Sequence, residues 1–111
     1  MPRHLSLTEL RARLAAREVS AKEAVQACLD QIQRREPELH AFISWDTAGA
    51  LAQAEAADKA LAGGVPAEQP LLGVPIGLKD VIAAQGQPLT CGSRILGNFV
   101  SPYDATVTAR L

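Results

Sequence analysis

The sequence has few cysteines, and they lack the spacing of a metal site. Its two cysteines, Cys28 and Cys91, lie far apart, and neither belongs to a CxxC pair. A zinc site needs about four Cys or His ligands at short spacings, which His4 and His40 do not supply. We therefore expect no metal site. A reduced pair of cysteines is favoured, although the sequence leaves one disulfide open.

Neither sign of charge dominates, and no apolar run is long. The chain has eleven Lys and Arg residues and twelve Asp and Glu residues, which gives a formal net charge of −1. This balance lacks the basic character of a nucleic-acid-binding domain. No apolar run approaches the roughly 20 residues that cross a bilayer, and Arg and Glu interrupt residues 1–17, unlike a secretion signal. The sequence predicts a cytoplasmic protein that does not contact membranes.

Two capping boxes near the start predict a leading α-hairpin. In a capping box the Ser hydroxyl accepts from the third helical amide, and a Glu three residues on reaches back to the cap amide. SLTE, residues 6–9, opens a helix expected over residues 7–17. SAKE, residues 20–23, opens a second helix, which we expect Pro37 to stop.

An Ala-rich helix is predicted next, after a short strand. Residues 41–45, AFISW, read as the strand. Asp46 or Thr47 then caps a helix over residues 48–62, because alanine is the best helix former. A loop rich in Gly, Pro and polar residues separates this mainly helical part, residues 1–62, from the rest of the chain.

An apolar run that leads into Lys79 reads as a buried strand over residues 72–78. With a period of two, its apolar side chains share one face, while Gly77 and Lys79 lie on the other. A lysine beside a glycine has open space over it, and within an active site burial would disfavour its ammonium form, so that the neutral amine takes a proton from a nearby hydroxyl. A lysine that simply marks the end of a strand is more frequent, so the spacing alone leaves both roles open. The expected apolar face consists of Val74, Ile76 and Leu78.

Hydroxyl side chains follow the lysine. Thr90, Ser93 and Ser101 are placed to line a pocket, although Ser and Thr are equally typical of turns. Cys91 has no neighbouring His to make it a nucleophilic thiolate, and we interpret it as a small buried residue. Asp104 is the expected N-cap of a last helix. That helix has no stop signal before the apolar Leu111, so we expect a truncated sequence.

GVPIGLKD, residues 73–80, resembles the G-[IV]-P-[IV]-x-[IVL]-K-D segment of the amidase signature family. TCGSRIL, residues 90–96, and NFVSPYDATV, residues 98–107, are more specific. They resemble the glutamine-hydrolysing A subunits of bacterial tRNA-dependent amidotransferases within that family. The resemblance extends over the whole chain and is strongest over residues 71–111. Two departures, Gly77 for the usual Ala and Val81 for the usual Asn, leave the lysine in place.

The resemblance implies an α/β fold, a mixed sheet flanked by helices. Residues 1–111 are then the N-terminal portion of a single domain, and its catalytic core starts at residue 71. Lys79 matches the lysine of the family's Ser-cis-Ser-Lys triad, which takes a proton through a bridging serine so that a second serine attacks the amide. Both serines belong to a GGSSGG-like loop that residues 1–111 lack. We therefore expect no nucleophile or bridging serine here, an inactive fragment, and a supporting role for Thr90 and Ser93.

The resemblance also implies partners. The A subunit hydrolyses glutamine, and a partner subunit uses the ammonia to amidate misacylated tRNA with ATP and Mg²⁺. This chain would then need no cofactor of its own and would contact tRNA mainly through the other subunits. Two alternatives stay open: another amidase-signature amide hydrolase, or a complete non-catalytic α/β interaction domain in which Lys79 is charged and exposed.

Overall fold

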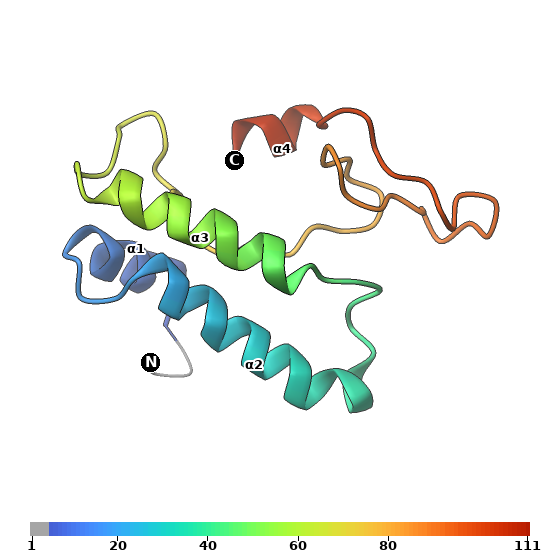
Figure 1. Ribbon diagram of the computed structural model, residues 1–111, viewed down its shortest axis with the longest axis horizontal. Helices are drawn as coiled ribbons and strands as arrows, with labels where there is room; N and C mark the ends of the chain where they lie inside the picture. Colours follow the sequence, from blue (N-terminus) through green and yellow to red (C-terminus); the bar gives the residue numbers. More distant parts are fainter. Residues whose placement is uncertain (1–4) are drawn as a thin grey trace. The chain divides into compact units, whose positions relative to one another are not determined.

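The computed structural model describes residues 5–111, so that His4 lies outside the described residues. This part of the chain contains four helices, α1 (Leu7–Ala15), α2 (Ala21–Leu39), α3 (Thr47–Leu61) and α4 (Thr106–Arg110). The chain divides into two compact units, with the boundary between Pro75 and Ile76. The first unit holds α1 to α3, and the second is mostly loop and ends in α4 (Figure 1).

The first two helices begin where the capping boxes predict. Ser6 and Ser20 each accept from the amide of the Glu three residues on, and each Glu side chain returns the bond. The expected stop at Pro37 is wrong, because α2 continues to Leu39. Proline removes one amide donor, but the turn around it persists because the His40 amide donates to the Glu36 carbonyl at 2.9 Å. The helix ends where His40 adopts a left-handed conformation, φ 49°.

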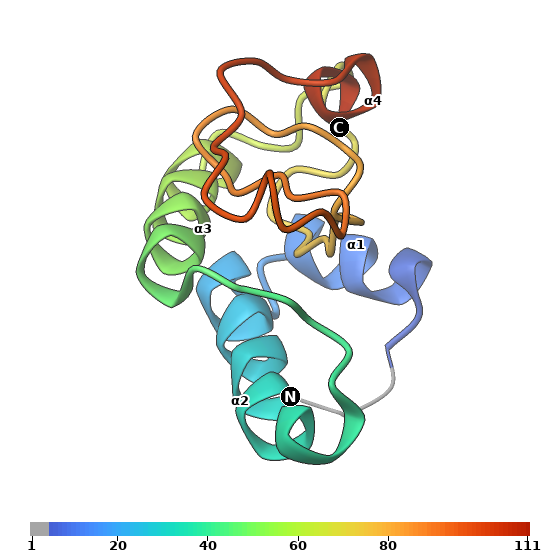
Figure 2. The same ribbon diagram turned by 90° about the vertical axis from the view of Figure 1, so that its right-hand side faces the viewer.

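Helices α2 and α3 run antiparallel, side by side, and form most of the core of the first unit (Figures 1 and 2). The side chains of α3 that reach the core are mainly alanines, which allow the two helices to approach closely. Asp46 caps α3 by accepting from the Gly49 amide at 2.9 Å. Cys28, on α2, is exposed and does not belong to this core. The core consists of Leu10, Leu14, Ala21, Ala24, Val25, Leu29, Ala54, Ala57 and Leu61.

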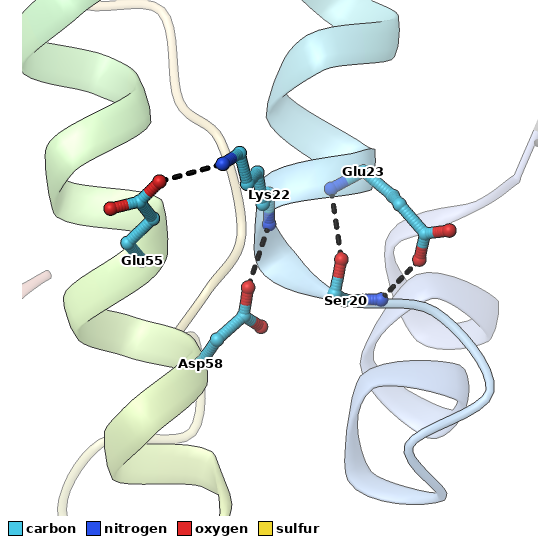
Figure 3. A network of polar contacts seen from close by, with 5 residues as sticks. All are labelled: Ser20, Lys22, Glu23, Glu55 and Asp58. Atoms are coloured by element: carbon cyan, nitrogen blue, oxygen red, sulfur yellow. Dashed lines mark hydrogen bonds and ion pairs between the residues drawn. The ribbon is translucent and has the colours of Figure 1, made fainter.

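A carboxylate on α3 completes the cap of α2. Asp58 accepts from the amides of Ala21 at 2.6 Å and Lys22 at 3.1 Å, and Ser20 accepts from the amide of Glu23 at 3.0 Å. The first three amides of α2, which have no partner within the helix, are therefore all bonded. Figure 3 shows the bonds from the amides of Lys22 and Glu23. This contact joins the N-terminus of α2 to α3.

Neither predicted strand forms within residues 5–111. AFISW is irregular, and the run at residues 72–78 is broken by a turn in which the Val74 amide donates to the Leu71 carbonyl. Gly73 adopts φ 86°, and a Cβ there would lie 3.1 Å from both Ala21 Cβ and Leu61 Cδ1, so the turn packs tightly on α2 and α3. A strand needs a paired neighbour to satisfy its backbone, and the described residues contain a single bridge, Pro88 with Val100.

Backbone hydrogen bonds hold the second unit together. Gly86 and Ser101 are joined by an amide-to-carbonyl bond of 2.9 Å, next to the single bridge. Ser101, 1% exposed, donates its hydroxyl to the Tyr103 carbonyl at 2.7 Å. The prediction that Asp104 caps α4 is wrong. Its carboxylate accepts from the Gln85 amide at 2.7 Å, and α4 begins after Ala105 without a side-chain cap.

No helix among the described residues combines the length and apolar character needed to cross a membrane.

Candidate active site around Lys79

Lys79 lies near the start of the second unit, with its side chain exposed. Its carbonyl accepts from the Ile82 amide at 2.9 Å, so the lysine begins a tight turn. Of the apolar face expected before it, Val74 packs against the core of the first unit, whereas Ile76 is 47% exposed and Leu78 is 40% exposed. The turn therefore fixes the backbone of Lys79 and leaves the amine free to reach a neighbouring group.

Asp80, the next residue, binds a loop ten residues further on. Its carboxylate accepts from the Thr90 amide at 2.7 Å, from the Thr90 hydroxyl, and from the Gly92 amide at 3.4 Å. The Asp80 carbonyl accepts from the Cys91 amide at 2.9 Å. Three successive amides, those of residues 90–92, therefore donate to one residue. We call this set of contacts the Asp80 clamp.

The clamp stabilises the charged form of Asp80. Hydrogen bonds from the Thr90 hydroxyl and amide lower the pKa of the Asp80 carboxyl below its ordinary value, with smaller contributions from the Gly92 amide and the positive charge of Lys79. Donors to a carboxylate favour ionisation. Asp80 is therefore a bound anion whose oxygens already have partners.

The predicted site residues gather only in part. Thr90 is tied to the residue after Lys79 through the clamp, whereas Ser93 contributes its amide to the Thr90 carbonyl at 2.8 Å. Ser101 is buried and bonded to Tyr103, so its hydroxyl has a structural role. The interpretation of Cys91 as buried is wrong, because it is exposed at the tip of the clamped loop. There it adopts a left-handed conformation, φ 52°.

Asp80 has no role in the sequence-based prediction. Sequence spacing does not reveal that residue 80 meets residue 90, because the contact depends on the turn at Lys79 and on the positive φ of Cys91 and Gly92. The available signal is weak. An Asp after an apolar run, followed later by Thr-x-Gly, is a combination of residue types that bind loop amides.

The lowered pKa of Asp80 predicts how the clamp responds to acid. A carboxyl whose folded pKa lies below its unfolded value, about 3.9 for Asp, contributes stability above that value and loses it as pH falls through the folded pKa. The Thr90 amide resonance in ¹⁵N-threonine-labelled full-length protein should therefore titrate with a midpoint below about 3.9. Asp80→Asn should abolish the step. A midpoint at or above the ordinary Asp value would contradict the clamp.

The chain belongs to the Amidase family, which its sequence matches over residues 23–111. Lys79 and the Asp80 clamp both lie within the matched range. Among curated relatives, the A subunit of glutamyl-tRNA(Gln) amidotransferase from Mycolicibacterium vanbaalenii is 51% identical over 111 aligned positions, which cover 96% of this chain and 22% of that protein.

Two further relatives carry the same name. The A subunits from Mycobacterium bovis and Mycobacterium ulcerans are 50% and 51% identical over 102 positions, covering 92% of this chain and 21% of each relative. The chain therefore spans about a fifth of the length of the curated relatives it matches. The family resemblance seen in the sequence motifs is confirmed.

Proposed function

We propose that this chain is the base-bearing part of the glutamine-hydrolysing subunit of a tRNA-dependent amidotransferase. The observation that carries the proposal is identity of about half the residues, over nearly the whole chain, with proteins named as A subunits of glutamyl-tRNA(Gln) amidotransferase. In this proposal residues 1–111 are one portion of a single domain with a mixed sheet, whose strands need partners from outside these residues. The protein works in the cytoplasm, where tRNA is charged.

Lys79 is the proposed general base. Its backbone begins a tight turn and its side chain is exposed among the described residues, so in this proposal the groups that cover it and react with it come from outside residues 1–111. A neutral lysine takes a proton from a hydroxyl. Here that hydroxyl belongs to a bridging serine outside residues 1–111, which in turn activates a nucleophilic serine to attack the glutamine carboxamide. The acyl-enzyme then forms as ammonia leaves, and water releases glutamate.

The partners follow from the same proposal. Other subunits of the complex receive the ammonia and hold ATP, Mg²⁺ and most of the tRNA surface. We assign no metal or organic cofactor to this chain. Thr90 supports the site through Asp80, whereas Ser93 contributes to the shape of the same loop.

The test measures amide hydrolysis by the full-length protein in complex with its partner subunits. We expect glutamine to yield glutamate and ammonia in equal amounts, and ammonia to reach misacylated tRNA when ATP and Mg²⁺ are present. Simple aliphatic amides serve as competing substrates. Hydrolysis of these amides without hydrolysis of glutamine would identify another amidase of the family, and hydrolysis of neither would refute an enzymatic role.

A further inference from the structure

Three successive backbone amides in the second unit point at one residue. The amides of Thr90 and Gly92 donate to the carboxylate of Asp80, and the amide of Cys91 donates to its carbonyl. Successive amides that converge on one group form an anion-binding concavity. Here two of the three amides bind the Asp80 carboxylate and the third binds the Asp80 carbonyl, so all three already have a partner in the same unit.

The clamped loop has an unfavourable backbone that the clamp offsets. Cys91 and Gly92 both have positive φ, 52° and 72°. Glycine adopts this region freely, but a residue with a side chain does so rarely. Such conformations persist only where surrounding contacts over-determine them, and they cluster at functional sites. The bonds from residues 90–92 to Asp80 are those contacts.

The clamp also fixes the backbone that carries Lys79. On one side of the Lys79–Asp80 peptide, the Lys79 carbonyl accepts from the Ile82 amide at 2.9 Å. On the other side, the Asp80 carboxylate and carbonyl are bound by residues 90–92. The backbone at the lysine is thus held by local and distant contacts, while its side chain is exposed.

We propose that Asp80 and Thr90 are positioning residues that hold the backbone of Lys79 in the orientation from which its amine reaches the bridging serine. This inference rests on the proposed function. Asp80 acts through Lys79 and contacts no reacting group, because both of its carboxylate oxygens already accept from the loop. The Thr90 hydroxyl is the one side-chain donor of the clamp. It distinguishes threonine from the isosteric valine at this position.

The test compares three variants of the full-length protein in its complex. In Asp80→Ala and Thr90→Val we expect kcat for glutamine hydrolysis to fall, by up to about 10²-fold in Asp80→Ala, as is typical when a catalytic group is displaced by about 1 Å. KM for glutamine should stay near the parent value, because binding is not the affected step. The double variant should be no slower than Asp80→Ala alone, since both changes open one clamp.

The control is Asp104→Ala. Asp104 also accepts from a loop amide, that of Gln85 at 2.7 Å, in the same unit, but this bond involves neither Lys79 nor a residue of the Asp80 clamp. Its loss should leave kcat at the parent level. Asp80→Asn and Thr90→Ser keep an acceptor or the hydroxyl and should recover much of the lost turnover. If Asp80→Ala fails to fold, the turnover of these two conservative variants still tests the proposal.

Three results would overturn the proposal. The first is parent-level kcat in both Asp80→Ala and Thr90→Val, and the second is a loss of the same size in Asp104→Ala. The third is a loss that appears only in KM. If the parent protein hydrolyses no amide, the proposed function fails, and the clamp is tested by hydrogen exchange at the Ile82 amide. This amide should exchange faster in Asp80→Ala than in the parent and in Asp104→Ala, and equal rates would show that Asp80 does not hold Lys79.

Discussion

Replacing Lys79 with alanine in the full-length protein is expected to lower glutamine turnover by about 10²–10⁴-fold, the usual loss when a general base is removed. The fold should be retained because the Lys79 side chain is exposed. The hydrogen bond that forms the turn, from the Ile82 amide, also uses only the backbone carbonyl of Lys79. The measurement is kcat for glutamate release, paired with thermal unfolding of the same preparation.

Two controls separate a base from a mere charge. Lys79→Arg keeps the positive charge, but a guanidinium does not deprotonate in proteins, so this variant should be nearly as slow as Lys79→Ala. Lys59, on the last turn of α3, is a lysine of the first unit with an exposed side chain. Lys59→Ala should keep parent turnover. Near-normal turnover in Lys79→Ala would refute the assignment of Lys79 as the base.

The helices are predictable because their signals are local. Ser6, Ser20 and Asp46 each cap a helix through an amide three residues away, so the whole device lies within one turn of sequence. The prediction for Pro37 is wrong because the end of α2 is set three residues later. There His40 adopts a left-handed conformation.

The strands and part of the site are less predictable because they depend on distant contacts. An apolar run such as residues 72–78 becomes a strand only beside a partner, and the described residues offer none. Gly73 turns the backbone there in order to pack on α2 and α3. Lys79 is identified from a motif that matches a family, whereas the pairing of Asp80 with Thr90 has no trace in periodicity or spacing.

The role of Asp104 also depends on a distant contact that the sequence does not show. An Asp just before a helix is a good capping candidate by residue type. The carboxylate is instead used by the Gln85 amide, nineteen positions earlier. When one acceptor has both a local and a distant donor available, the sequence alone does not decide between them.

Asp58→Ala is expected to destabilise the first unit by about 1–3 kcal/mol of unfolding free energy. The Asp58 carboxylate is the acceptor for the amides of Ala21 and Lys22, and Figure 3 shows its bond with the Lys22 amide. Ala21 is 0% exposed, so its amide would be left buried without a partner and without access to water. The 2.6 Å contact with Ala21 therefore matters more than the 3.1 Å contact with Lys22.

The measurement is hydrogen exchange of the α2 amides in the full-length protein, which reports the free energy of local opening. Asp58→Asn keeps one carbonyl acceptor but loses the negative charge that suits a helix N-terminus. The protection of the α2 amides in this variant should therefore lie between that of the parent protein and that of Asp58→Ala. Glu55→Ala is the matched control, because it removes only the exposed ion pair with Lys22 and such pairs contribute little. An equal loss of protection in Asp58→Ala and Glu55→Ala would mean that charge near α2, rather than the satisfied Ala21 amide, holds the helices together.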